Sequence, residues 1–201
     1  MRFPKDQKAQ TRERILDAAA TVFRRDGFAG GGVDAVMREA GLTAGGFYAH
    51  FPSKDALFAE AVVHALRKST LYTGPHLDGL AGAAWVAAAV ARYLSPQHRE
   101  RMATGCPLPA LLSEVARGPA AAKAGFEGEL KQAAALIGGH LPEAGDTAFA
   151  VLALMVGGMV LARGVADEGL SDRILSACRD AGVKVSKGKR AAKKVKNKES
   201  K

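Results

Sequence analysis

GVDAVMREAGLTAGGFYAHFPSKDAL, residues 32–57, is the stretch that decides the fold of the N-terminal part of this chain. Its first part predicts a short helix, because apolar residues recur at the spacing of one helical face: Val33, Val36, Met37 and Ala40. Gly41 ends this helix, since glycine takes the left-handed backbone conformation at a helix C-terminus without steric cost. The stretch therefore begins with a helix that closes on a tight glycine turn.

A second helix follows the turn at once. The hydroxyl of Thr43 can cap this helix. The helix spans residues 44–51, is short, and contains glycine and aromatic residues. Pro52 stops this helix, and Ser53 caps the next one. Helix, glycine turn and helix in this order are typical of a helix-turn-helix, which places its second helix in the DNA major groove.

The rest of the chain predicts an all-α protein of about nine helices, because no segment alternates apolar and polar residues long enough to propose a strand. Pro142 opens one apolar helix, and Ser171 caps the last one. The predicted domains are a helix-turn-helix DNA-binding domain at 1–52, a ligand-sensing and dimerisation domain at 53–183, and a lysine-rich tail at 184–201. The nine expected helices span residues 8–25, 33–40, 44–51, 53 to about 70, 80–94, 108–117, 119–137, 142–165 and 172–181.

The positive charge of the chain is concentrated at one end. Its 201 residues carry a formal charge of +9. Residues 1–60 hold nine basic and eight acidic side chains, whereas residues 184–201 hold nine basic and one acidic. A segment of that composition is expected to be disordered. It is either a solubilising extension or a non-specific clamp on DNA phosphates.

Cysteine content and hydropathy point to the cytoplasm. Cys106 and Cys178 are too few for a disulfide framework and fit a reducing compartment. The N-terminus is interrupted by charges and lacks the apolar core of a signal peptide. The longest uncharged run, residues 147–162, is shorter than the about 20 residues that a membrane-spanning helix needs, so a buried helix of a soluble protein is expected.

The segment from residue 11 to residue 66 resembles the DNA-binding domain of TetR-type transcriptional regulators. The resemblance rests on TRERILDAAATVFRRDGF and on VDAVMREAGLTAGGFYAHFPSKDAL, with linked positions at fixed spacing. These positions include the glycine turn, the aromatic second helix with Gly45, Tyr48 and Phe51, and the start of the third helix at Ser53. The resemblance implies a homodimeric, ligand-responsive regulator, usually a repressor, that binds a palindromic operator.

The same resemblance assigns a DNA-binding surface. It places on the DNA side Thr43, Ala44, Gly45, Tyr48 and His50, and it matches Lys54 to a phosphate contact. Gly32 occupies a position that usually holds a capping Ser or Thr, so its phosphate contact is reduced to a backbone N–H.

The chemistry of the second helix suits phosphate contacts better than base reading. Hydroxyls and exposed N–H groups at a helix start are good phosphate donors. Gly45 and Gly46 allow the backbone to approach the groove, while Phe47 and Phe51 are expected in the core. No Arg or Asn is present to read a base bidentately, so specificity is expected to rest on His50, on a thymine-methyl contact by Ala44 and on DNA shape.

The sensing domain offers several candidates for a small-molecule pocket. They are His64, Trp85, Tyr93, Phe126 and Met155, and each of them could equally be an ordinary core residue. Cys106 stands just before a predicted helix, whose N-terminal dipole would stabilise a thiolate that senses electrophiles or oxidants. The alternative for Cys106 is a buried, inert thiol.

The predicted function is a ligand-responsive repressor that acts as a homodimer on double-stranded DNA. The apolar helix at 142–165, with the last helix, would form the dimer interface. An architectural, nucleoid-type DNA-binding protein is the alternative. No paired carboxylates, nucleophile–base motif or metal-ligand spacing indicates an enzyme, and no cofactor is expected.

Overall fold

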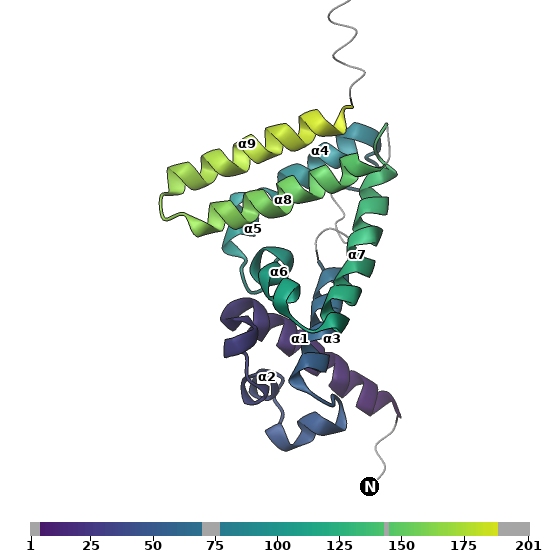
Figure 1. The fold of residues 1–201 in the computed structure, drawn as a ribbon, viewed down its shortest axis with the longest axis vertical. Helices are drawn as coiled ribbons and strands as arrows, with labels where there is room; N and C mark the ends of the chain where they lie inside the picture. Colours follow the sequence, from purple (N-terminus) through teal and green to yellow (C-terminus); the bar gives the residue numbers. More distant parts are fainter. Residues whose placement is uncertain (1–4, 70–76, 143–144, 189–201) are drawn as a thin grey trace, which may run out of the picture. The chain divides into compact units, whose positions relative to one another are not determined.

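The computed structural model describes residues 5–69, 77–142 and 145–188, and these residues form helices without a β-strand (Figure 1). The all-α prediction is therefore confirmed. The chain divides into two compact units. The first, here the N-terminal unit, holds the described residues of 1–72 and 101–130, and the second, the C-terminal unit, holds those of 73–100 and 131–201.

The N-terminal unit is built around two long helices, α1 and α3, which pack on each other. Its elements are α1 (Lys5–Gly30), α2 (Val33–Glu39), the 3₁₀-helix η1 (Ala44–Ala49), α3 (Lys54–Arg67), α6 (Leu108–Arg117) and the first part of α7 (Ala120–Gly138). Three aromatic rings form the centre of the core. Phe58 of α3 lies 5.4 Å from Phe23 and 4.7 Å from Phe28, between ring centroids.

A break in α1 brings α6 into this unit. Gly27 has φ 74° and interrupts the helical backbone, which allows the chain to turn before Phe28. The backbone N–H of Phe28 then donates to both carboxylate oxygens of Glu114 on α6, at 2.8 and 2.9 Å. The predicted end of the first helix near residue 25 thus corresponds to a real change of direction.

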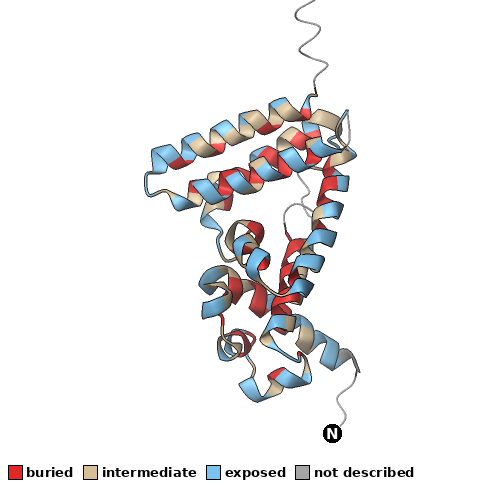
Figure 2. Ribbon diagram, viewed as in Figure 1, coloured by how far each residue is buried: buried red, intermediate tan, exposed pale blue. Residues whose placement is uncertain are grey.

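The C-terminal unit holds α4 (Gly82–Tyr93), α5 (Pro96–Glu100), α8 (Asp146–Gly164), α9 (Glu168–Ser186) and the end of α7. Helices α8 and α9 lie side by side (Figure 1). Gly158 permits this approach, because a Cβ there would come within 2.9 Å of the Cys178 sulfur. Figure 2 shows buried residues of α8 alternating with exposed ones along the helix.

Several predicted boundaries are wrong. The segment 44–51 is a 3₁₀-helix rather than an α-helix, because six residues with two glycines favour i to i+3 hydrogen bonding. The apolar helix begins at Asp146, after Gly145 with φ 107°, and not at Pro142. The short helix α5 lies between the expected helices at 80–94 and 108–117, where no helix was predicted.

The last helix also differs from its prediction. It begins at Glu168, where the side chain of Asp167 accepts from the backbone N–H of Leu170. Ser171 is therefore not the cap. It is buried inside the helix, and its hydroxyl donates to the carbonyl of Ala162 at 2.7 Å.

The helix α9 continues to Ser186, so the first residues of the segment 184–201 are helical and not disordered. The remainder of that segment, from residue 189, lies outside the described residues.

The compact units group the chain differently from the predicted boundary between residues 52 and 53. Helix α3 packs on α1, and α6 also contacts α1, within the N-terminal unit. The functional assignment of the segments 1–52 and 53–183 remains a prediction.

In the part of the chain that the structure describes, one helix is long and apolar enough to cross a membrane, namely α8. The same helix packs on α9, α4 and α5, so length and composition alone do not distinguish a membrane span from a core helix.

Candidate nucleic-acid interface

The turn between α2 and η1 has the geometry of a Schellman motif. Gly41 has φ 66°, its N–H donates to the carbonyl of Arg38 at 3.0 Å, and the N–H of Leu42 donates to that of Met37 at 2.8 Å. Arg14 of α1 closes the turn by donating from Nη2 to the carbonyl of Ala40 at 2.7 Å. The predicted glycine turn is confirmed, and α1 holds it in place.

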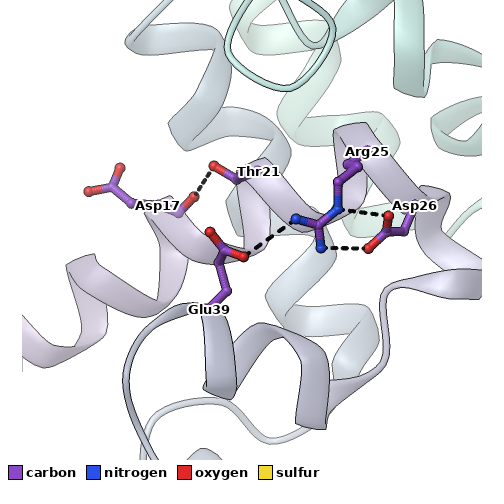
Figure 3. Close-up of polar contacts among 5 residues, drawn as sticks. All are labelled: Asp17, Thr21, Arg25, Asp26 and Glu39. Atoms are coloured by element: carbon purple, nitrogen blue, oxygen red, sulfur yellow. Dashed lines mark hydrogen bonds and ion pairs between the residues drawn. The ribbon is translucent and has the colours of Figure 1, made fainter.

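One salt bridge, from Arg25 to Glu39, attaches α2 to α1 on the other side. Arg25 lies 2.9 Å from Asp26 and 3.5 Å from Glu39 of α2 (Figure 3). Each ion pair of this exposed group contributes little stability by itself, because water screens the charges. Together with the hydrogen bond from Arg14 to Ala40, the contact of Arg25 with Glu39 holds α2 and the turn against α1.

One face of η1 belongs to the core and the other is open. Phe47 and Phe51 are fully buried, and their rings stack at 6.0 Å. The guanidinium of Arg12 lies 4.5 Å from the centre of the Phe51 ring. The expected core role of both phenylalanines is confirmed. The open face carries four of the predicted DNA-binding residues, which are exposed: Thr43, Ala44, Gly45 and Tyr48.

Tyr48 is the most exposed of the large apolar side chains in the described part of the chain, with 73% of its surface accessible. Its ring meets the buried Phe47 edge to face at 5.1 Å, which orients the phenol. A phenol oriented in this way can donate to a phosphate or pack against a sugar.

His50 is neutral in this structure at neutral pH. Burial lowers the pKa of its imidazole, and the nearby charges of Lys8 and Arg12 lower that pKa further. Its Nδ1 is buried and has no hydrogen-bond partner among the described residues. This leaves Nε2 as the ring nitrogen for a contact with DNA.

Glycine at three predicted site positions is not required by the packing of the protein. No described atom lies within 4 Å of a Cβ built at Gly32 or at Gly45, and at Gly46 the nearest is the Met37 methyl group at 3.7 Å. Gly32 caps α2 without a side-chain bond, as predicted. A role for Gly45 in close backbone approach to DNA is consistent with this open space and stays a prediction.

The predicted polar groups differ in how the structure bears on them: the Thr43 cap is not formed, and the phosphate contact of Lys54 stays a prediction. Thr43 stands at the N-cap of η1, but its hydroxyl makes no capping hydrogen bond, so it remains available to a ligand. Lys54 begins α3, and its ammonium lies 4.4 Å from the centre of the Phe28 ring. Ser53 caps α3 as predicted, accepting from the N–H of Ala56 at 3.1 Å.

The sequence interpretation missed the two basic residues of α1 beside this surface. Lys8 and Arg12 are four residues apart, hence on one face of α1, and both act electrostatically on His50. Their spacing was visible in the sequence, but their proximity to η1 depends on how α1 packs.

Comparison with known proteins agrees with this geometry. Residues 15–61 match the model of a family described as bacterial regulatory proteins, tetR family. The N-terminal segment of this chain therefore has the sequence of a TetR-family DNA-binding segment. The uncharacterized HTH-type transcriptional regulator YdgC of Bacillus subtilis is 40% identical over 58 residues, which are 29% of this chain and 30% of that protein. The HTH-type transcriptional regulator AcrR of Shigella flexneri is 36% identical over 56 residues, 28% of this chain and 26% of AcrR.

The whole fold of this chain also has solved counterparts. A TetR-family regulator from Cytophaga hutchinsonii superposes with a TM-score of 0.71 at 19% identity, covering 91% of this chain and 98% of that one. This likeness shows the fold. The matched segments span less than a third of YdgC and AcrR, so what those proteins do as a whole is not carried over.

The predicted effector residues fall in both units of the chain. In the N-terminal unit, Nε2 of His64 lies 2.7 Å from Asp17, Phe126 is half-buried, and Cys106 is fully buried just before α6. Burial lowers the pKa of Arg24, and an ionised Cys106 would raise it. His64 also lines a cavity in this unit.

The other three candidates are buried in the C-terminal unit. The ring of Trp85 stacks on His140 at 4.1 Å and 6°, and Tyr93 meets His98 at 4.5 Å. Met155 lies on the buried face of α8. Within this unit the three residues have the burial of core side chains, and their role in effector binding stays a prediction.

Proposed function

We propose that this chain is a homodimeric transcriptional repressor that binds a palindromic DNA operator through η1 and releases it on binding an effector. The observation that carries the proposal is the open face of η1. The glycine turn and two buried phenylalanines fix the position of η1. Its open face carries small residues and the oriented phenol of Tyr48, and these exposed side chains are not part of the core. Such a surface fits a groove rather than a pocket.

The contacts expected with DNA are mostly with the phosphates. The free hydroxyl of Thr43, the phenol of Tyr48 and the ammonium of Lys54 are donors, and the N–H at Gly32 is a fourth. Ala44 and Gly45 would let the backbone lie close to the bases, with Nε2 of His50 as a polar contact at the end of η1. Sequence preference then depends on DNA shape as well as on base edges.

The support for a dimer is an exposed apolar face on α8. Phe149, Val160 and Leu161 are 44%, 44% and 60% exposed, and Gly157 and Ala153 between them are also exposed. Exposed large apolar residues on one helix mark interaction sites. A two-fold dimer would supply two copies of η1 for the two half-sites of an operator.

The effector is proposed to be either a small molecule or a thiol-reactive compound. For the first class the candidate residues are those named above in the two units. For the second, Cys106 beside Arg24 is the candidate, although its complete burial favours an inert thiol. The variant Cys106→Ser tests whether the effector acts through this thiol. If peroxide, quinones and aldehydes release the operator from the variant as they do from the wild type, the proposal of a thiol-reactive effector is wrong.

Competition with bulk DNA tests the proposal against the architectural alternative. A repressor should keep a preference of about 10³-fold or more for one selected palindrome over random duplex. An architectural protein would show nearly equal affinities, with a steep dependence on salt. Equal affinity for all duplexes would contradict the repressor proposal.

A further inference from the structure

The N-terminal unit contains a polar cavity of about 140 Å³ beside the contact of α1 with α3. It is lined by Asp17, Thr21 and Arg24 of α1, by His64 of α3 and Lys68 at the C-terminal end of α3, and by the loop around Gly105. A single water needs about 10–15 Å³ of such space, so the cavity has room for a small organic molecule. None of the predicted DNA-binding residues lines it.

The cavity has more positive charge than its one carboxylate balances. The Nε2 of His64 and the ammonium of Lys68 both lie 2.7 Å from the same oxygen of Asp17. Partial burial raises the pKa of the Asp17 carboxyl, but the hydrogen bonds from Lys68 and His64 outweigh it and leave the pKa lowered. Asp17 is the one carboxylate of the lining, beside the two cations Arg24 and Lys68, so at least one positive charge of the lining is not balanced.

Arg24 contributes a half-buried cation that has no carboxylate bonded to it among the described residues. Its Nε and Nη1 donate to the carbonyls of Ala103 and Gly105 at 2.7 and 3.2 Å. A guanidinium has five N–H donors, so three remain. Burial lowers the pKa of Arg24, which expresses the cost of keeping this charge away from water.

Asp17 and Thr21 lie one turn apart on α1 (Figure 3). The hydroxyl of Thr21 donates to the carbonyl of Asp17 at 3.1 Å, so α1 presents its acidic and hydroxyl groups to the cavity in a fixed order. The carboxylate of Asp17 thus holds His64 and Lys68 in place, while the guanidinium of Arg24 is held by the loop. The two cationic groups are fixed before any ligand arrives.

We infer that this cavity binds a small monocarboxylate, whose anionic group is held by the fork of Arg24 and by Lys68. A carboxylate matches two parallel N–H groups of a guanidinium, and its single charge balances the positive charge that Asp17 leaves unbalanced. The bound anion joins α1, α3 and the loop before α6, three parts of the unit that carries η1.

Binding can be measured on the protein alone, so its failure is distinguishable from failure of the DNA-binding proposal. Calorimetric titration with pyruvate, acetate and inorganic phosphate, at constant ionic strength balanced with chloride, compares the two anion classes. Pyruvate or acetate should bind saturably at one site per chain. Lys68→Gln and Arg24→Lys should each weaken this binding by about tenfold or more, since each removes a charge-assisted hydrogen bond.

Lys123→Gln is the matched control, because Lys123 is an exposed lysine of α7 away from the cavity. It should leave the affinity unchanged, and circular dichroism verifies that all variants are folded. Arg24→Lys keeps the charge and loses the fork, so its effect separates geometry from charge. The inference is overturned if no carboxylate binds, if phosphate binds more tightly than pyruvate, or if Lys123→Gln weakens binding as much as Lys68→Gln.

Discussion

At the scale of single residues, η1 is the proposed DNA-facing element, and it carries no formal charge. Tyr48 is oriented by Phe47 and exposed, Thr43 has a free hydroxyl, and His50 is held neutral. The sequence was sufficient to predict which of these residues face outward, because Phe47 and Phe51 occupy the opposite face. It was insufficient to predict the lowered pKa of His50, which depends on burial and on the charges of Lys8 and Arg12, residues of α1 that are distant in the sequence.

The lowered pKa of His50 predicts a pH dependence of stability. Because the folded protein holds this imidazole neutral, the unfolded chain takes up the proton first as the pH falls below its ordinary value of about 6.5. The contribution of His50 to the free energy of unfolding is therefore intact above that pH and declines below it. Urea unfolding at pH 7 and pH 5.5 should show a smaller decline for His50→Gln than for the wild type. An equal decline would show that His50 is not desolvated.

At the scale of elements, the turn and the caps decide how η1 is presented. The glycine turn, the α2 and α6 helices and the Ser53 cap were predictable, because each follows from a local rule on residue type and position. The 3₁₀ form of η1 and the five-residue α5 were not, since elements this short have too few residues for a periodic pattern. The start of α9 was misplaced because Ser171 and Asp167 are both acceptable caps, and packing against α8 selects Asp167.

Two glycines of the helix-turn-helix should respond oppositely to alanine. At Gly41, with φ 66°, a side chain is strained, so Gly41→Ala should lower the free energy of unfolding by about 1–2 kcal/mol. At Gly45 no described atom crowds a Cβ, so Gly45→Ala should keep the stability within about 0.5 kcal/mol and weaken operator binding instead. Chemical denaturation and a DNA-binding titration of both variants measure this. Unchanged operator affinity of Gly45→Ala would argue against close backbone approach.

A hydroxyl introduced at the start of α2 should raise both the free energy of unfolding and the affinity for the operator. Gly32 has φ −66° and ψ 158°, which suits a capping serine, and the space around it is open. Gly32→Ser should raise the free energy of unfolding by a few tenths of a kcal/mol and tighten operator binding by adding a phosphate donor. Gly32→Ala serves as the control, since it adds a Cβ without a hydroxyl. Equal operator affinity of the serine and alanine variants would contradict a phosphate contact at this position.

At the scale of the whole molecule, the chain combines a DNA-facing unit with a unit whose longest apolar helix has an uncovered face. The resemblance to the TetR family was predictable from linked residues of the N-terminal third, and the all-α fold was predictable because no segment of the chain alternates as a strand does. The effector residues were not, because a buried aromatic residue such as Trp85 has the same sequence signature in a core and in a pocket. The proposed dimer likewise depends on which apolar side chains of α8 stay exposed, and this exposure is set by how the helices pack.

The exposed face of α8 predicts that charge there breaks the dimer. Leu161 is 60% exposed, so Leu161→Glu should fold normally, and a carboxylate desolvated in a dimer interface should shift the protein to monomer. Sedimentation at micromolar concentration measures this. Leu80→Glu, at a 39% exposed leucine outside α8, is the control and should leave the dimer intact. A wild type that is monomeric under these conditions would rule out the interface.

The affinity of Tyr48→Ala for a selected operator tests the central claim most directly. Operators are first selected from a random DNA pool with the wild-type protein, and the selected duplex is then titrated with Tyr48→Ala and with Leu80→Ala as the control. Loss of an oriented phosphate contact at each half-site should weaken binding by about tenfold or more for Tyr48→Ala, with circular dichroism unchanged. Leu80→Ala should bind as the wild type does. Recovery of no common palindrome, or equal affinity of Tyr48→Ala and wild type, would contradict the assignment of η1 as the DNA-reading element.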